Sequence, residues 1–274
     1  MLFRSVDTQH NPWEWMTVAS LQTYRGGRAI QSAASRLIDL GRKNACLVWH
    51  CEPELVDYAV GVYTHRNTGD TLSLGQLSRG YMTKTGNTIG EPLQATGWYR
   101  VADVEDPDPE TGMGNVASSW TFGAQACSLR VEKSSGRIEI LHFASAFDIG
   151  KAINPRLVEG QIRGGVVQGL GGVLMEKIVF KDGVIRNTNF SGYRIPKLRD
   201  IPKKQSFFIL ETPNKVGPWS AKPVAEHPIV VVAPVVLNAV ADATGIEFTR
   251  LPLTPDVVLE ASTKIGRASC RERV

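Results

Sequence analysis

The chain has 274 residues, of which 42% are hydrophobic and 21% are charged, and its formal net charge is +4. This length allows one large domain or two ordinary ones, and this composition is typical of a globular protein and excludes a disordered or fibrous one. Half of the net charge comes from the final ten residues, where three arginines face one glutamate. The weak basicity of the remainder therefore predicts no nucleic-acid partner.

Neither the N-terminus nor the longest apolar run has the pattern of a targeting or membrane segment. The N-terminus lacks the apolar run of a signal peptide, and the longest apolar run, 229–237, is about half of the roughly 18 residues that a membrane helix needs. We therefore expect no membrane partner and a cytoplasmic location, with export to the periplasm as the open alternative. Residues 265–274 resemble the reading frame of a sequencing-adapter oligonucleotide, so we treat 262–274 as an artefactual or disordered tail.

Three cysteines remain outside that tail: Cys46, Cys51 and Cys127. An odd number at loose spacing is neither a disulfide framework nor a zinc pattern. A metal site formed by Cys46, His50 and Cys51 is the less favoured alternative. The pattern favours buried thiols in a reducing compartment.

The first elements alternate between helical and extended patterns. Apolar residues at helical spacing predict a helix over 27–44, with Gly41 and Asn44 at its end. Residues 58–63 predict a short strand, and 72–82 predict a helix capped by Thr71. The Asp-, Pro- and Gly-rich stretch 103–114 predicts an exposed loop, which is the best internal boundary.

The second half of the chain predicts a hairpin and two long helices. We expect a hairpin with strands within 116–131 and 138–143 around a turn at 133–136. A helix is predicted over 155–178, with Asn154 as its cap and Pro155 at its first position. A tight turn at 181–183, a strand over 206–210 and a helix over 229–244 that ends at Gly245 follow. This mixture predicts an α+β fold with mixed sheets packed against helices.

The segment 147–171, FDIGKAINPRLVEGQIRGGVVQGLG, combines an acid, a capped helix start and a helix with five glycines. Each glycine costs a helix about 1 kcal/mol relative to alanine, so a close backbone approach is the expected compensation. The approaching body could be another helix or a bulky ligand. The residues alone favour helix packing and leave both alternatives open.

Two further segments have the composition of a binding site. In 7–30, small residues and free backbone N–H groups precede a helix, which suits either an anion cradle or an ordinary capped loop. In 217–245, Glu226 lies inside an apolar stretch. A buried carboxylate has a raised pKa and can accept a proton near neutral pH. It can also be satisfied by hydrogen bonds from a helix N-terminus, and Pro228 is a residue type that often begins a helix. Both interpretations of Glu226 stay open.

In this order, the three segments resemble signatures of the molybdenum subunits of the xanthine dehydrogenase/aldehyde oxidase family. The first match comprises Asp148, Gly150, Ile153, Asn154, Pro155, Val158, Gly160, Gln161, Gly164, Gly165, Gln168 and Gly169. The second comprises Asp7, Thr8, Pro12, Thr17, Ala19, Ser20, Thr23, Tyr24, Gly27 and Ala29. The third comprises Gly217, Pro218, Ala221, Lys222, Val224, Glu226, Pro228, Ala233, Pro234, Asn238 and Ala239.

The resemblance implies roles for individual residues. Glu226 stands at the position of the family's catalytic base. The implied cofactor-binding residues are Ala19, Ser20, Gln22, Gly160, Gln161 and Lys222, with Gln161 at the position of a pterin contact. An ordinary helix residue bonded to a loop is the alternative for Gln161. No protein side chain is implied as a metal ligand.

The resemblance also implies a function and a set of partners. Residues 1–261 would be the C-terminal part of a molybdopterin-binding domain, with a sub-boundary in the 103–114 loop. The implied reaction is hydroxylation of an aldehyde or an N-heterocycle with water as the oxygen source. The implied cofactor is molybdenum-molybdopterin, as the plain pterin or as a dinucleotide, with [2Fe-2S] and FAD on other domains or subunits. The partners would be the N-terminal half of the molybdenum subunit, iron–sulfur and flavin subunits, and a small-molecule substrate, so we expect the chain alone to be inactive.

Several positions depart from the family signatures. Ser220, Pro223 and Ala225 stand where the family has glycine, His227 stands where it has proline, and Leu21 replaces an arginine. Glycines at such positions let a backbone pass close to a cofactor. These departures motivate an alternative of another class: a cofactor-free domain that serves as a structural or interaction module.

Overall fold

The computed structural model describes residues 7, 9, 16–102 and 104–271, with side chains up to residue 263. The chain divides into two compact units. Unit 1 comprises Met1–Leu21 and Ser119–Val274, and unit 2 comprises Gln22–Ser118. The predicted 103–114 loop therefore belongs to unit 2, close to its end. Of the sequence motif at 7–30, residues 8 and 10–15 lie outside the described part.

Unit 2 is organised around one long helix, α1 (Gly27–Trp49), which follows a π-helical turn at Gln22–Gly26. The predicted helix is confirmed, but its predicted end is wrong, because Gly41 and Asn44 are both buried inside it. A Cβ at Gly41 would lie 2.0 Å from the Tyr63 hydroxyl, so glycine is needed there for packing. Asn44 accepts from the Glu91 amide at 3.2 Å and donates to the Glu91 carbonyl at 2.7 Å.

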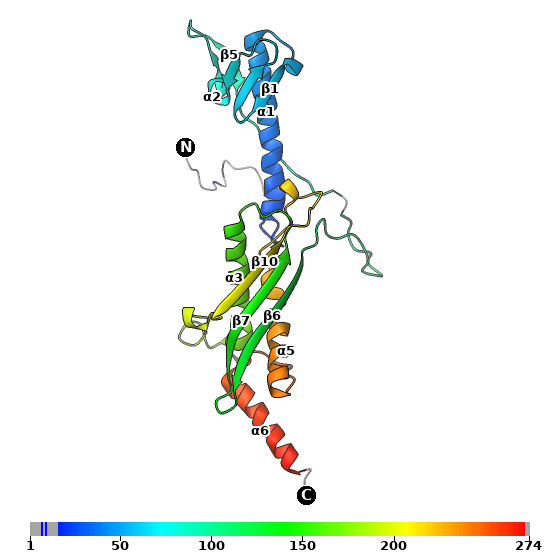
Figure 1. Ribbon diagram of the computed structural model, residues 1–274, viewed down its shortest axis with the longest axis vertical. Coiled ribbons are helices and arrows are strands. Elements are labelled where there is room, and N and C mark those ends of the chain that lie inside the picture. Colours follow the sequence, from blue (N-terminus) through cyan, green and yellow to red (C-terminus); the bar gives the residue numbers. More distant parts are fainter. Residues whose placement is uncertain (1–6, 8, 10–15, 103, 272–274) are drawn as a thin grey trace. The chain divides into compact units, whose positions relative to one another are not determined.

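Short strands lie beside α1 in unit 2 (Figure 1). They are β1 (Val56–Ala59), β2 (Val62–His65), β3 (Thr71–Ser73), β4 (Arg79–Met82) and β5 (Thr88–Pro92). The predicted single strand over 58–63 is wrong, because Val60 and Gly61 have positive φ and turn the chain between β1 and β2. The predicted helix over 72–82 is also wrong, since only α2 (Leu74–Leu77) is helical, and Ser73 rather than Thr71 caps it.

A mixed three-stranded sheet forms the centre of unit 1 (Figure 1). The predicted hairpin is confirmed as β6 (Phe122–Glu132) and β7 (Arg137–Asp148), and β10 (Lys204–Leu210) lies parallel to β7. A parallel pair needs a crossover, which α3 (Pro155–Leu174) supplies. The predicted cap of α3 is confirmed, because the Asn154 side chain accepts from the Leu157 amide at 3.1 Å. The fold is α+β.

The remaining elements of unit 1 follow the sheet. The predicted helix over 229–244 is present as α4 (His227–Val230) and α5 (Val232–Thr244), and Gly245 ends it with φ 71°. The predicted tight turn joins β8 (Phe180–Lys181) and β9 (Val184–Ile185). Two 3₁₀ turns occupy Leu198–Asp200 and Pro218–Ser220. The last helix, α6 (Pro255–Arg271), runs into the expected tail, whose origin stays a prediction.

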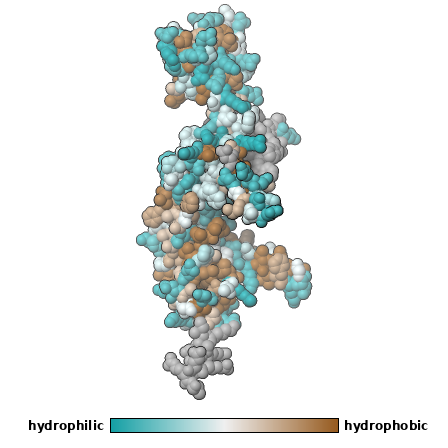
Figure 2. All heavy atoms as spheres, turned by 90° about the vertical axis from the view of Figure 1, so that its right-hand side faces the viewer, coloured by the Kyte–Doolittle hydropathy of each residue, from teal (hydrophilic) through white to brown (hydrophobic). Residues whose placement is uncertain are grey.

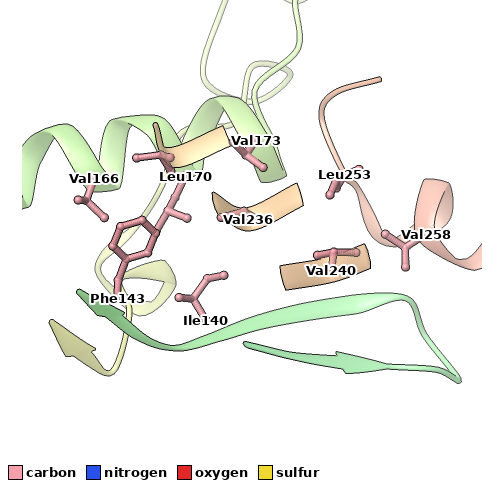
Figure 3. Packing of buried hydrophobic residues seen from close by; sticks show 10 residues of the cluster. Ile140, Phe143, Val166, Leu170, Val173, Val236, Val240, Leu253 and Val258 are labelled. Carbon is pink, nitrogen blue, oxygen red and sulfur yellow. The ribbon is translucent and has the colours of Figure 1, made fainter. Parts of the chain in front are cut away.

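The core of unit 1 lies between one face of the sheet and two helices, α3 and α5. Figure 3 shows Phe143 and Ile140 of β7 pointing toward Val166, Leu170 and Val173 of α3, with α5 beside them. By length and composition alone, His227–Thr244 is apolar enough to cross a membrane. Only 22% of this segment is buried, and Val232, Val236 and Val240 are the members that pack into this core.

The opposite face of the sheet carries exposed apolar side chains. Because Phe207 and Ile209 pack inward, Phe208 and Leu210 point to the other face, where they are 59% and 50% exposed. Phe122 at the start of β6 is 70% exposed. Hydrophobic residues reach the surface of unit 1 over several areas in Figure 2. Large exposed apolar areas usually mark surfaces that contact another body.

Candidate functional site

Glu226 lies at the residue before α4 and its side chain is exposed. The prediction that it is buried is therefore wrong. Its neighbours Pro223 and Pro228 take the buried positions, so the segment turns its prolines inward and its carboxylate outward. The alternative of a carboxylate that caps the helix is not realised, because the Glu226 side chain makes no capping hydrogen bond to α4.

The partner of Glu226 is Ser20, 206 residues earlier in the chain and in the same unit. The Ser20 hydroxyl donates to Glu226 Oε2 at 2.9 Å and accepts from the Glu226 backbone N–H at 2.9 Å. Two residues from separate sequence motifs thus meet through two hydrogen bonds. The structure brings together the predicted base and one of the predicted cofactor contacts.

The turn that carries Ser20 and the loop that precedes Glu226 in the chain both contain residues with left-handed backbone. Ala19 and Ser20 have φ of 52° and 59°, in a turn closed by the Leu21 N–H and the Val18 carbonyl at 3.1 Å. Trp219 and Ser220 have φ of 48° and 71°. Residues other than glycine rarely adopt such values, which cost about 1–3 kcal/mol each and cluster at active sites and ligand clamps.

Lys222 is buried and pairs with Asp148 at the end of β7, with 2.6 Å between Lys222 Nζ and Asp148 Oδ2. Burial raises the pKa of Asp148, but hydrogen bonds from Lys222, Gly150 and Thr212 outweigh it and hold this pKa below its ordinary value. Lys222 is thus committed to a buried ion pair. It fixes the loop that leads to Glu226.

A close backbone approach supports this ion pair. Gly150 has φ 59°, and a Cβ there would lie 2.1 Å from the Ser220 carbonyl. The Lys222 amide donates to the Ile149 carbonyl at 2.8 Å, and the Lys151 amide donates to the Ser220 carbonyl at 3.0 Å. The glycine of the D-x-G motif is therefore required for the loop before Glu226 to pack against the end of β7.

Four glycines of α3 divide between a packed face and an open face of the helix. A Cβ at Gly165 would lie 2.8 Å from Pro228 of α4, and a Cβ at Gly169 would lie 2.6 Å from Val232 of α5. The favoured prediction of helix packing is confirmed for these two. By contrast, a Cβ at Gly160 or Gly164 would meet nothing within 4 Å.

The open face of α3 also carries Gln161, whose side chain is exposed. Within the part of the chain that the structure describes, this side chain makes no hydrogen bond, so the alternative of a loop-bonded glutamine is not realised there. Gly160 and Gln161 therefore lie on a surface that leaves room for a further body. Gln22 is exposed in the π-helical turn of unit 2, whereas the other predicted site residues belong to unit 1.

The sequence predicts no role for three residues that contact or adjoin the segment around Glu226, which are Gln125, His227 and Asp148. Gln125 of β6 donates to the Pro228 carbonyl at 2.9 Å and to the Ser145 hydroxyl at 3.2 Å. His227 is half-buried, and this burial lowers its pKa against the smaller opposing effect of the Glu226 charge. Among the described residues, His227 Nδ1 has no hydrogen-bond partner. Asp148 stood inside one of the three matched segments, but only its contacts show what it does.

Other parts of the described chain offer less. No group of three His, Cys, Asp or Glu residues suited to a metal ion occurs among the residues described, and His50 is the left-handed residue that ends α1. A wide surface groove lies between the start of β7, residues 190–203 and residues 253–256. None of the predicted site residues lines it, so the candidate site is the Ser20–Glu226 region with the open face of α3.

Comparisons with known proteins found relatives that match most of this chain. The xanthine dehydrogenase molybdenum-binding subunit XdhA of Escherichia coli K12, a putative assignment, is 28% identical over 93% of this chain and 32% of its own length. The 6-hydroxypseudooxynicotine dehydrogenase complex subunit gamma of Paenarthrobacter nicotinovorans is 25% identical over 91% and 30%. The solved aldehyde oxidoreductase of Desulfovibrio gigas superposes with a TM-score of 0.71 at 25% identity, over 90% of this chain and 23% of that one.

The chain spans about a third of the length of these curated relatives. The family model described as "Molybdopterin cofactor-binding domain" matches residues 2–202. This match includes Ala19, Ser20, Gly160 and Gln161. The chain therefore belongs to the molybdopterin cofactor-binding domain family.

Proposed function

We propose that this chain is part of a molybdenum hydroxylase that oxidises an aldehyde or an N-heterocycle with water as the oxygen source, and that Glu226 is its catalytic base. The observation that carries the proposal is the pair of hydrogen bonds between Ser20 and Glu226, since they join two separate family motifs at one carboxylate. The names of the relatives, a xanthine dehydrogenase subunit and an aldehyde oxidoreductase, support the substrate class.

The residues present fit a molybdopterin. A flat, polar pterin needs amide contacts and close backbone approach, and the open stripe at Gly160 and Gly164 beside the exposed Gln161 provides both. The unpartnered His227 Nδ1 is a further polar group near Glu226. Gln161, Gly160 and the backbone at Ala19 would hold the cofactor. When bound, it supplies the two-electron oxidation chemistry.

The protein's own contribution is proton transfer and placement. Glu226 would accept the proton of the attacking water-derived oxygen, and such general-base help accelerates reactions by about 10²–10⁴-fold. The buried Lys222–Asp148 pair would hold the loop that carries Glu226. Exclusion of water would need a cover over Glu226, which is exposed here.

We propose that this cover comes from the rest of the molybdenum subunit, because the chain spans about a third of its relatives. The exposed outer face of the sheet and the open face of α3 are consistent with such a partner. Iron–sulfur and flavin components would receive the electrons. The isolated chain would then have no turnover.

The experiment is a molybdenum and pterin assay on the full-length subunit in its complex, with wild type beside Glu226→Gln. We expect both proteins to bind the cofactor and only wild type to turn over. Glu226→Gln keeps the size and the hydrogen-bond acceptor but removes the basic oxygen. Full activity of Glu226→Gln would refute the role of Glu226.

The second candidate is a cofactor-free domain that serves as an interaction module. It is favoured by Ser220, Pro223 and Ala225, which add side chains where relatives of this family have glycine. Ser220 in addition has φ 71°, a value that suits glycine better. Stoichiometric molybdenum in the wild-type subunit would exclude this candidate.

A further inference from the structure

We propose that Ser20 is a positioning residue that fixes the carboxylate of Glu226 and leaves Oε1 as the oxygen that accepts the proton. This inference rests on the proposed function of Glu226. It gives Ser20 a different task from the cofactor contact that the sequence motif suggests.

A serine hydroxyl has one proton to donate. Ser20 donates it to Glu226 Oε2 at 2.9 Å. A cofactor atom that needed a hydrogen-bond donor could not share it. Among the described residues no hydrogen bond reaches Glu226 Oε1, so the two carboxylate oxygens are not equivalent.

The same hydroxyl also fixes the backbone. It accepts the N–H of Glu226 at 2.9 Å, so the side chain and the main chain of Glu226 are both held by one atom. A carboxylate held at only one end could rotate about its side-chain bonds. Holding both ends restricts the direction in which Oε1 points, which is what a general base requires.

The turn that presents Ser20 is itself constrained. Ala19 and Ser20 both have left-handed backbone, and the Leu21 N–H to Val18 carbonyl bond closes the turn. Such a conformation persists only where surrounding contacts fix it. The two hydrogen bonds to Glu226 are such contacts, and they link the turn to the residue before α4.

The test uses Ser20→Ala and Ser20→Gly in the full-length molybdenum subunit within its complex. Both variants remove the hydroxyl, but glycine also relieves the left-handed backbone. We expect both to keep wild-type molybdenum content and KM and to lose between about 10-fold and 100-fold in kcat. Crystal structures of the two variants should show the Glu226 carboxylate rotated away from its position in wild type.

The matched control is Ser119→Ala, which removes another hydroxyl of unit 1 whose partner, Asn214 Nδ2, lies 3.1 Å away. It should leave kcat unchanged. If Ser20 served only the turn, Ser20→Gly would be as active as wild type, which would overturn the inference. Loss of molybdenum from Ser20→Ala would also overturn it, because Ser20 would then be a cofactor contact.

Glu226→Gln, measured beside these variants, separates this inference from the proposed function. If Glu226→Gln is inactive while Ser20→Ala and Ser20→Gly keep wild-type kcat and an unmoved carboxylate, the base is right and the positioning role is wrong. If Glu226→Gln is fully active, the proposed function fails and the inference fails with it.

Discussion

Lys222 and Asp148 form a buried ion pair, 2.6 Å between Nζ and Oδ2, that joins the end of β7 to the loop before Glu226. Their side chains are only 8% and 14% exposed. Hydrogen bonds from Gly150 and Thr212 complete the shell of the carboxylate. A pair so fully satisfied fixes one arrangement of the loop, and the position of Glu226 depends on that arrangement.

Lys222→Met should destabilise the protein by about 3–5 kcal/mol, because it leaves the buried Asp148 carboxylate without its cation. Methionine retains most of the length of the lysine stem, so the loss reports the charge rather than a cavity. Chemical denaturation of the purified chain would measure the free energy of unfolding.

The matched control for Lys222→Met is Lys151→Met. Lys151 pairs with Glu211 at 2.9 Å, but these side chains are 56% and 39% exposed. Exposed pairs contribute about 0–1 kcal/mol, so this variant should stay close to wild type. Equal losses in the two variants would contradict the assignment of a buried, stabilising pair to Lys222.

The Asp148–Lys222 pair also predicts a dependence of stability on pH. The pKa of Asp148 is held below its ordinary value, so its contribution is present above an unfolded-state pKa of about 3.9 and is lost as pH falls through the lower folded-state value. Between pH 5 and pH 2, wild type should therefore lose stability more steeply than Asp148→Asn. Parallel curves for the two proteins would show that Asp148 does not titrate in this way.

Much of unit 1 could be predicted from the sequence because its signals are local. Asn154 and Pro155 mark the start of α3, and Gly245 marks the end of α5, whatever packs around them. The family motifs likewise located Ser20 and Glu226. Their direct contact could not be predicted, since no local pattern relates residues 206 positions apart.

The errors have a common physical cause, which is that tertiary contacts override local preferences. Gly41 looks like a helix end, but the Tyr63 hydroxyl requires the absence of a Cβ there. Glu226 looks buried because its neighbours in sequence are apolar, yet Pro228 takes the inward position. Burial of one side chain in an irregular segment depends on the direction of the backbone, which hydrophobicity alone does not give.

The two faces of α3 predict opposite effects of adding one methyl group. Gly169→Ala would place a Cβ 2.6 Å from Val232, and such overpacking costs about 1–3 kcal/mol, more than the gain in helix propensity. Gly164→Ala meets nothing within 4 Å and should stabilise the purified chain by up to about 1 kcal/mol. Thermal unfolding of the two variants beside wild type would measure both effects.

The same pair of variants tests the open face of α3 in the full-length subunit. If the cofactor or the rest of the subunit approaches Gly164 closely, Gly164→Ala should lower the molybdenum content although it stabilises the chain alone. An unchanged molybdenum content would show that the space at Gly164 is not used.

Ser220 has φ 71°, in the left-handed region that favours glycine, so Ser220→Gly should be stabilising. A left-handed residue with a Cβ costs about 1–2 kcal/mol, while glycine loses about 0.5–1 kcal/mol through its more flexible unfolded state. The expected net gain is about 0.5–1 kcal/mol in the free energy of unfolding. Ala126→Gly in strand β6 provides the control, because at this regularly paired position glycine brings only the cost and should destabilise. A loss of stability in Ser220→Gly would mean that contacts of the serine side chain outweigh the strain of its backbone.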